Sequence, residues 1–488
     1  MSNRTRREFL EQSLFAAAAA ATAGAVTRRA FAEPEESSSS PGEKVRIAVL
    51  GVRGRGQSHL SGFKRRADCE IVAIVDPDEA IGHTQGVEKL EKETGRKPLF
   101  YKDVRKALED PNIDVVSIAT PNHWHALAAV WAIQHGKDVY CEKPVSHNVS
   151  EGRRIVQAAR KHGRIVQTGT QCRSNPANIE AIQFVKSGGI GTVKLARGLC
   201  YKRRPGIGPK GKYDVPASVD YDLWCGPAPV AELTRPKLHY DWHWVWDTGN
   251  GDLGNQGIHQ MDLCRWGLGV NDLGTGVVSY GGRLGYTDAG ETANTQVSIH
   301  SFGEKTLVFE VRGLETDKYY GADVGVIFHG SEGYVVMTRY DRGAAFDPDG
   351  NMIKTFTGGD DNLHYDNFVT AVRSRNVTDL NADILEGHLS SALCHLGNIS
   401  YRLGEDLPAS EAAARLPEAD ENRETFERVG QHLAANGVAL ESTKLRVGRQ
   451  LQFDPKEEVF VGPGSKDANP MLSREYRKGF EVPEASQV

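Results

Sequence analysis

A lysine held at the end of a short strand is the first candidate for chemistry in this chain. Val139 to Cys141 has the composition of a buried strand, and Glu142-Lys143-Pro144 follows it directly. Pro144 fixes its own φ and restricts the residue before it, so Lys143 is expected at a defined angle. A lysine that is partly desolvated in a cleft has a lowered pKa, which suits it to proton transfer. The alternative is an ordinary Lys-Pro turn at the surface.

A glycine-rich loop near the start of the chain predicts dinucleotide binding. Residues 45–50 are predicted to form a strand, followed by the loop Gly51-Val52-Arg53-Gly54-Arg55-Gly56 and a helix over 57–65. Such a loop places a pyrophosphate at a helix N-terminus. Gly51 and Gly56 match the first and third glycines of GxGxxG, whereas Arg53 takes the second position. Gly54 must therefore supply part of the conformational freedom that the loop needs. The alternative to dinucleotide binding is an ordinary βαβ turn without a ligand.

An acid after the second strand supports the same prediction. The strand over 70–75 ends in Asp76, which lies 20 residues after Gly56. At this spacing a carboxylate meets the ribose hydroxyls of the adenosine half of the cofactor. Because Asp76 would repel a 2′-phosphate, the sequence favours NAD over NADP.

The elements that must position these groups alternate in type along residues 45–170. Strands are predicted at 115–120, 139–141 and 165–171, and helices at 103–109, at 150–161 and after the segment Pro121-Asn122-His123-Trp124-His125. Repeated βα units of this length predict a doubly wound parallel sheet. The alternating segments at 276–280, 293–300, 306–312, 324–329 and 333–337 instead suit an antiparallel sheet.

Composition limits the class of protein. The chain has 488 residues, 39% of them hydrophobic and 25% charged, with a net charge of −5. It is therefore predicted to be a globular protein of two domains plus extensions, with no basic footprint for nucleic acid. The seven cysteines are scattered without metal-ligand spacing, so free thiols and no metal site are expected.

The N-terminus resembles an export signal. Arg6-Arg7-Glu8-Phe9-Leu10 precedes an apolar run over 14–26 and then Ala30-Phe31-Ala32. This pattern is similar to a twin-arginine signal with a cleavage site after Ala32, which predicts a periplasmic protein. Retention of the run as a membrane anchor is the alternative.

The glycine loop, the Thr-Pro-Asn-His-Trp-His segment and the Glu-Lys-Pro strand end together resemble the Gfo/Idh/MocA oxidoreductase family over about residues 45–405. The resemblance implies an N-terminal Rossmann domain and a C-terminal α/β domain with a large, open, mostly antiparallel sheet. It also implies that Lys143 lies beside the nicotinamide and the reacting hydroxyl, often through a cis Lys-Pro bond. The expected cofactor contacts are Gly51, Arg53, Gly54, Arg55, Gly56, Asp76, Thr120, Pro121, Asn122, His125, Glu142, Lys143 and Gln171.

A second catalytic segment is expected between Gly249 and Asp262. Helical spacing puts Asn255 and His259 on one face, with Asp262 three residues further. The family resemblance implies an Asp at the position of Asn255. Asparagine can bind a hydroxyl but cannot accept a proton, so Lys143 or His259 must carry the acid–base work. A buried structural histidine is the alternative for His259.

The remaining substrate contacts are predicted from aromatic, basic and polar residues in the second half. Aromatic rings in the loops could stack on sugar rings, although a tryptophan is equally at home in the core. The predicted substrate contacts are Tyr201, Arg203, His239, Trp242, Asn255, His259 and Asp262.

Three functions remain open on the sequence. The first is an NAD-dependent oxidoreductase acting on a secondary hydroxyl of a sugar or polyol. The second is a glycoside hydrolase that uses bound NAD in transient oxidation, elimination and reduction, and the third is a binding protein that kept the fold.

The expected organisation is a signal over 1–32, a linker over 33–44, an NAD-binding domain over 45–170, a substrate domain over 171–405, and a C-terminal helix with an extended arm over 406–488. The helix is expected near residues 418–436, and the arm is expected to pack on the core or on a neighbouring subunit. The expected partners are a carbohydrate and, by family resemblance, a second or further copies of the chain in a homodimer or homotetramer.

Overall fold

The structure is a computed structural model that describes residues 43–488. The predicted signal and the linker as far as residue 42 lie outside the described residues. Within 43–488, no helix is both long enough and apolar enough to span a bilayer.

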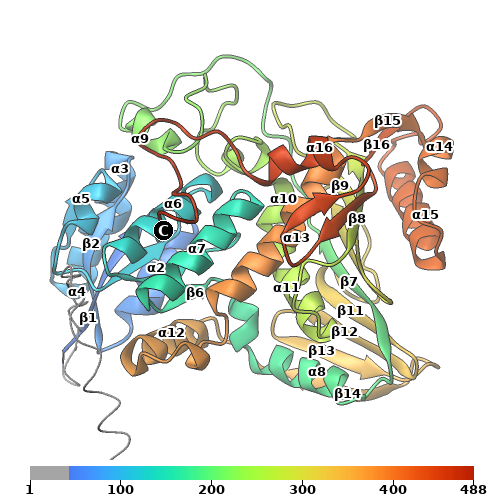
Figure 1. Ribbon diagram of the computed structural model, residues 1–488, viewed down its shortest axis with the longest axis horizontal. Coiled ribbons are helices and arrows are strands. Elements are labelled where there is room, and N and C mark those ends of the chain that lie inside the picture. The colour runs from blue at the N-terminus through green and yellow to red at the C-terminus, as the bar shows by residue number, and fades with distance from the viewer. Residues whose placement is uncertain (1–42) are drawn as a thin grey trace, which may run out of the picture. The chain divides into compact units, whose positions relative to one another are not determined.

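The first domain is a parallel sheet of six strands within the described chain, ordered β3-β2-β1-β4-β5-β6. Helices cover both faces of this sheet, α5, α6 and α7 on one face and α2 and α12 on the other (Figure 1), and each set packs on the strands through an apolar cluster. The strand order reverses between β1 and β4, and ligands of open α/β sheets bind beyond the strand ends at this point. The strands are β1 Val45–Leu50, β2 Cys69–Val75, β3 Leu99–Tyr101, β4 Val115–Ile118, β5 Asp138–Cys141 and β6 Val166–Thr168. The helices are α2 Arg55–Lys64, α3 Glu79–Ile81, η1 Gly82–Val87, α4 Glu88–Thr94, α5 Val104–Leu108, α6 Asn122–Gln134, α7 Val149–His162 and α12 Asn362–Ser374.

The second domain is a large sheet whose main path runs β14-β13-β12-β11-β7-β10-β9-β8-β16-β15. In the described chain its pairings are antiparallel except for β7 with β10, as expected for a mostly antiparallel sheet. Its strands are β7 Val193–Tyr201, β8 Gly276–Gly282, β9 Thr295–Phe302, β10 Lys305–Arg312, β11 Val324–Gly330, β12 Gly333–Arg339, β13 Arg342–Phe346, β14 Met352–Thr357, β15 Glu405–Pro408, β16 Lys444–Val447, β17 Leu451–Asp454 and β18 Val459–Val461. The other elements are η2 Gln171–Ser174, α8 Pro176–Lys186, α9 Tyr221–Cys225, η3 Asp241–Trp244, α10 Gly251–Asn255, α11 Gly257–Leu268, η4 Val377–Asp379, α13 Ile384–Arg402, α14 Ala409–Ala414, α15 Asp420–Ala435, α16 Ser465–Ala468 and η5 Asn469–Leu472.

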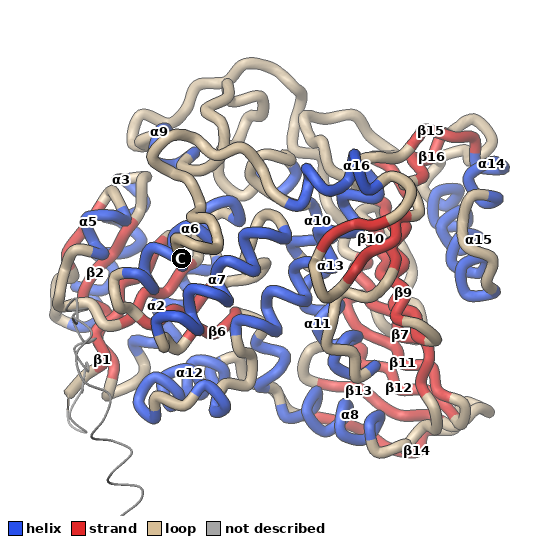
Figure 2. Tube along the Cα trace, in the orientation of Figure 1, coloured by secondary structure: helices blue, strands red, loops and turns tan. Residues whose placement is uncertain are grey.

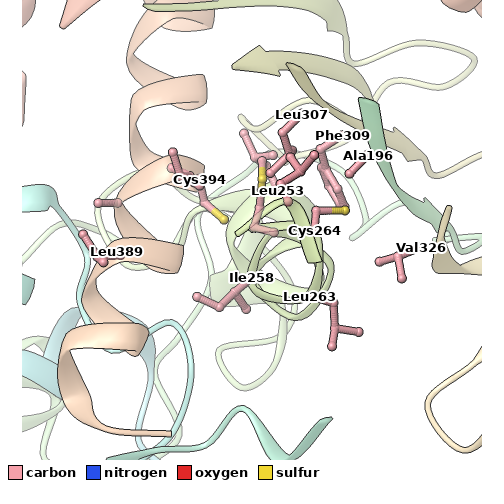
Figure 3. Close-up of a cluster of buried hydrophobic side chains, with 14 of the residues drawn as sticks. Ala196, Leu253, Ile258, Leu263, Cys264, Leu307, Phe309, Val326, Leu389 and Cys394 are labelled. Atoms are coloured by element: carbon pink, nitrogen blue, oxygen red, sulfur yellow. The ribbon is translucent and has the colours of Figure 1, made fainter. Parts of the chain in front are cut away.

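The core of the second domain fixes α10 and α11 against one face of this sheet. Figure 3 shows Ile258, Leu263 and Cys264 around the helix, with Leu389 and Cys394 of α13 beside it. Each of these side chains is at most 5% exposed. Because apolar burial stabilises by about 25 cal/mol per Å², this packing holds the segment that carries Asn255 in a defined place.

The opposite face of the sheet is covered by α15. Its apolar residues pack on β8, β9 and β10, and Arg428 of the same helix binds the fully buried Glu310 of β10 at 2.6 Å. Apolar contacts and a buried ion pair therefore both hold α15 on the sheet.

The arm over 406–488 contains more regular structure than the sequence predicted. The expected helix is α15, but β15 to β18 were missed, and β16 and β17 both pair with β8. These strands are only three or four residues long, and β15, β16 and β17 pair with residues far away in the sequence, so the local pattern is too short to reveal them. Of the two expected alternatives, the arm packs on the core of its own chain.

Candidate active site

The glycine loop joins β1 to α2 at the switch point of the parallel sheet. Gly51 has a φ of +76°, and a Cβ there would lie 2.8 Å from the carbonyl oxygen of Ala119. Gly54 has a φ of +57° and open space around it, as its predicted conformational freedom requires. Arg53 is exposed and lines the cavity described below.

Gly56 lies behind the loop and sets how closely the helix approaches it. A Cβ at Gly56 would lie 2.0 Å from the carbonyl oxygen of Gly51. We expect Gly56→Ala to weaken NAD binding by about 10- to 100-fold, because overpacking costs about 1–3 kcal/mol and displaces the loop. Isothermal titration of nucleotide-free protein measures the change.

Gly430→Ala in α15 is the matched control for this substitution. Its Cβ would meet only the flexible end of the Leu440 side chain, at 3.1 Å. NAD affinity close to wild type is expected for this variant. An unchanged affinity in Gly56→Ala would contradict the assigned role of the loop.

Asp76 lies at the carboxyl end of β2. Its two carboxylate oxygens accept the N–H groups of Val52, at 3.2 Å, and Asp78, at 3.0 Å. Burial raises the pKa of Asp76 to about 6, although both hydrogen bonds favour its ionised form. Asp76 therefore stands at one end of the cavity with its oxygens oriented by backbone groups.

A crossing segment, which we define as residues 202–250, bridges this end of the cavity. Most of it is loop (Figure 2). Its Ser218 hydroxyl donates to Asp78 at 2.8 Å, and His239 Nε2 lies 2.8 Å from the same carboxylate. Backbone bonds from Glu79 N to Ser218 O and from Asp220 N to Pro77 O, at 3.0 and 2.9 Å, add to the connection. The crossing segment is thus tied to the turn that follows β2.

Lys143 follows β5 and meets the second domain. The Lys143-Pro144 peptide bond is cis, which confirms the expectation from the family. The Lys143 ammonium donates to the carbonyl oxygen of Asn255 at 2.6 Å and lies 3.4 Å from its side-chain oxygen. Burial lowers the pKa of Lys143 to about 8, while the neighbouring Glu142 charge acts in the opposite direction.

A helix break makes the Asn255 carbonyl available to this lysine. The predicted continuous helix from Asn255 to His259 is wrong, because α10 ends at Asn255 and α11 begins at Gly257. The N–H of His259, which an unbroken helix would direct to Asn255, donates to Gln256 O at 3.2 Å instead. The Asn255 amide N–H₂ donates to Asp252 at 3.3 Å, which turns its side-chain oxygen towards Lys143.

Glu142 is buried and charged beside Lys143. Burial alone would raise its pKa, but Arg55 and His59 hold the pKa well below the ordinary value. Arg55 Nε donates to its carboxylate at 2.8 Å, and His59 Nε2 lies 3.1 Å away. Glu142 thus fixes the side of the cavity that α2 provides.

These residues surround a cavity of about 440 Å³, within the usual range for a small-molecule site. Most of the predicted cofactor contacts line it, namely Gly51, Arg53, Gly54, Arg55, Asp76, Thr120, Pro121, Asn122, His125, Glu142 and Lys143. Of the predicted substrate contacts, His239, Trp242 and Asn255 line it.

Six predicted site residues do not line this cavity, namely Gly56, Gln171, Tyr201, Arg203, His259 and Asp262. Gly56 acts through the loop, and Gln171 is 7% exposed at the start of η2. His259 is 4% exposed, its ring centroid lies 5.4 Å from that of Tyr340, and burial lowers its pKa well below the ordinary value.

Three of the predicted substrate contacts are corrected by the structure. Side chains alternate between the two faces of a strand, and Tyr201 is one of the β7 residues on the face that α15 covers. Its hydroxyl donates a hydrogen bond to Glu310 at 2.8 Å on that face. The Arg203 side chain is 76% exposed and faces Glu315. Asp262 is buried and receives two hydrogen bonds from Arg173, at 2.7 and 2.9 Å.

His243 lines the cavity but was missed as a site residue. The available signal was the density of aromatic and histidine residues over 239–246, which predicted a binding wall without resolving its members. Asp252 was also missed. It forms a buried ion pair with Arg204 at 2.7 Å. The two residues are 48 positions apart in the sequence, so only the folded structure reveals this contact.

The switch point, the glycine loop and the acid after β2 define a dinucleotide-binding α/β protein with a second α/β domain. Residues 45–170 match a family model described as an oxidoreductase family with an NAD-binding Rossmann fold, and residues 206–431 match the model of its C-terminal alpha/beta domain. The chain belongs to this family, Gfo/Idh/MocA, which confirms the resemblance that the motifs indicated.

Several known proteins are similar to parts of the chain. Inositol 2-dehydrogenase 1 of Saccharopolyspora erythraea is 30% identical over 149 residues, which are 30% of this chain and 43% of that protein. Glycosyl hydrolase family 109 protein 1 of a Shewanella species is 32% identical over 180 residues, 33% of this chain and 38% of that protein. The chain thus matches less than half the length of each of these relatives.

Among solved structures, the WlbA dehydrogenase of Bordetella pertussis in complex with NADH and UDP-GlcNAcA is similar in fold. The TM-score is 0.56 at 21% identity, over 74% of this chain and 97% of that one. At this identity the likeness concerns the fold alone.

The residues of the first domain fit an NAD cofactor. Arg55 Nη2 and Thr120 Oγ1 belong to cavity-lining residues and are buried without a hydrogen-bond partner among the described residues. Buried polar groups normally have partners, so these two donors suit a polar ligand in the cavity. Gly54, next to Arg55 in the chain, has open space around it.

Proposed function

We propose that the protein is an NAD-dependent oxidoreductase acting on a secondary hydroxyl of a sugar or polyol. The observation that carries this proposal is the position of Lys143, whose ammonium group meets Asn255 at the junction of the cofactor cavity and the second domain. A lysine with a pKa of about 8 can exchange a proton near neutral pH. The similarity to inositol 2-dehydrogenase 1 supports a polyol as the substrate.

The residues of this chain would divide the work as follows. Bound NAD supplies the hydride acceptor at its nicotinamide. Lys143 would take the hydroxyl proton as a neutral amine, and the two Asn255 oxygens would accept hydrogen bonds from its side-chain nitrogen and hold it in place. Trp242 lies on the wall that the crossing segment provides, where it would orient the sugar ring. His239 instead binds Asp78 at the Asp76 end of the cavity.

A glycoside hydrolase with transient oxidation of the sugar is the second candidate. The similarity to glycosyl hydrolase family 109 proteins of Shewanella favours it, although that similarity spans 38% of the relative. The same lysine and cofactor cavity would serve both reactions, so the two candidates differ in their net products.

Nucleotide analysis followed by a substrate panel tests both candidates. The purified protein is denatured, and any released nucleotide is identified by mass spectrometry. Native protein is then given free sugars, inositols and aryl glycosides while the absorbance of reduced nicotinamide is followed. We expect bound or bindable NAD and a lasting rise in absorbance on a free sugar or polyol.

Other outcomes of the same experiment decide between the candidates. Release of the aglycone without net reduction would support the hydrolase. Absence of NAD, together with no binding when NAD is added, would overturn both.

We also propose export of the folded, cofactor-loaded protein by the twin-arginine pathway, on the basis of Arg6-Arg7 and the apolar run that follows. Replacement of both arginines by lysine should keep the precursor inside the cell, as measured by fractionation. Unchanged export would contradict this proposal.

A further inference from the structure

A histidine that the sequence did not single out lines the same cavity as Lys143 and Asn255. His243 belongs to η3 and is 8% exposed. It lines the cavity, whereas His259, the histidine expected from the family, does not. The His243 ring is stacked on Trp242, with ring centroids 3.6 Å apart, so its orientation is restricted.

The hydrogen bonds of His243 determine which ring nitrogen carries the hydrogen. Nδ1 lies within hydrogen-bonding distance of the carbonyl oxygen of Tyr240. A carbonyl oxygen can only accept, so Nδ1 must be the donor. Burial lowers the pKa of His243 to about 3, which keeps the ring neutral at physiological pH. Nε2 is therefore left with a lone pair and no hydrogen.

A chain of polar contacts holds the Tyr240 carbonyl in place. Tyr240 has a φ of +66° and a ψ of −47°, the strained geometry of a γ-turn, in which the N–H of Asp241 donates to the carbonyl oxygen of His239 at 2.9 Å. Its hydroxyl accepts a hydrogen bond from Arg204 at 3.0 Å. Arg204 in turn binds Asp252 through two hydrogen bonds, at 2.8 and 2.7 Å.

The same carboxylate orients the other side of the cavity, because Asp252 also accepts the amide N–H₂ of Asn255 at 3.3 Å. One buried ion pair thus fixes both Asn255 and the turn that sets His243. A histidine that merely filled space would not need its tautomer fixed by a strained backbone turn.

We propose that His243 Nε2 accepts a hydrogen bond from a second hydroxyl of a polyhydroxylated substrate while Lys143 serves the reacting hydroxyl. This inference rests on the proposed function, and it names the substrate class more narrowly as a molecule with at least two hydroxyls. His243 acts as a neutral acceptor and takes no proton. It selects against deoxy analogues, because without the second hydroxyl its Nε2 has no partner.

Two substitutions separate the two nitrogens of His243. His243→Asn can keep a donor near the position of Nδ1, and so the bond to Tyr240, while it removes Nε2. We expect it to raise KM for the polyol by about 10- to 100-fold, with a much smaller change in kcat and no change in NAD affinity. His243→Gln, whose amide oxygen can reach the position of Nε2, should recover part of the loss.

Substrate analogues provide the readout that a structural role would not move. KM is measured for the wild type and for His243→Asn with a series of monodeoxy analogues, each of which lacks one hydroxyl. The analogue that lacks the hydroxyl bound by Nε2 should have the same KM with both proteins, because it cannot make the bond that the substitution removes. The pH dependence assigned to Lys143 should persist in the variant. His432→Asn is the matched control, since His432 is 4% exposed on α15 and lies outside the cavity. Its KM should match that of the wild type.

The outcomes separate this inference from the proposed function. A wild type that oxidises no polyol would overturn the proposed function, and this inference with it. An active wild type with an unchanged KM in His243→Asn would overturn this inference alone. So would a KM increase of equal size for every deoxy analogue, which would reflect loss of fold.

Discussion

Replacement of Lys143 by methionine is expected to lower kcat/KM for the sugar or polyol by about 10²–10⁴-fold, the usual contribution of a positioned acid or base. Methionine has a similar length and is uncharged, so the cavity keeps its shape while the proton acceptor is lost. Steady-state kinetics with the best substrate of the panel measures the effect. A loss of about tenfold or less would contradict the assigned role.

The pH dependence of this activity follows from the same residue. To accept a proton, Lys143 must be neutral, and burial lowers its pKa to about 8. Oxidation of the hydroxyl should therefore increase as the pH rises through about 8 and level off above it. In Lys143→Met this inflection should be absent from the profile of kcat/KM.

Lys143→Arg separates loss of the base from loss of charge. Arginine keeps the positive charge but does not deprotonate in proteins, so this variant should be nearly as inactive as Lys143→Met. Both variants should retain NAD, because Glu142 keeps its bonds to Arg55 and His59. Loss of NAD in both would indicate a damaged cavity rather than a missing base.

Replacement of Asp262 by alanine is expected to destabilise the protein by about 3–5 kcal/mol, because two buried arginines, Arg173 and Arg265, would then share the single carboxylate of Glu386 and one buried charge would be left uncompensated. Asp262 accepts hydrogen bonds from Arg173, at 2.7 and 2.9 Å, and from Ser390, at 2.8 Å. Arg265 and Arg173 are both less than 10% exposed. Urea unfolding followed by tryptophan fluorescence measures the loss, and KM should remain close to the wild-type value.

The surface ion pair of Glu304 with Lys194 is the matched control for Asp262. The Glu304 side chain is 84% exposed, and an ion pair in water is screened, so Glu304→Ala should leave the free energy of unfolding close to the wild-type value. If Asp262→Ala instead raised KM and left stability unchanged, Asp262 would be the substrate contact that the sequence predicted.

The first domain could be predicted from the sequence because its signals are local. The glycines, Asp76 and Lys143 each follow directly on a strand, and parallel strands end at the same edge of the sheet. Contacts in the second domain depend on which face of an element turns towards the cavity. Tyr201 has the composition expected of a sugar contact, but strand parity places it on the outer face.

The second catalytic segment shows a related limit. Spacing alone cannot reveal that α10 stops at Asn255, because the break depends on packing against the sheet and α13. The break changes what Asn255 contributes, since its main-chain oxygen now binds Lys143. In the same way, Asp252 and His243 acquire their positions only from the folded crossing segment.

The bridge between the crossing segment and the turn after β2 has a kinetic consequence. The crossing segment is connected to the turn after β2 across the Asp76 end of the cavity by the side chains of Ser218 and His239 and by two backbone hydrogen bonds. If NAD binds beneath this bridge, its release requires the bridge to open, and its residence time would follow the rate of local unfolding. We therefore expect NAD to behave as a resident prosthetic group that survives gel filtration. A catalyst of this kind must return its electrons to a second molecule before the next turnover.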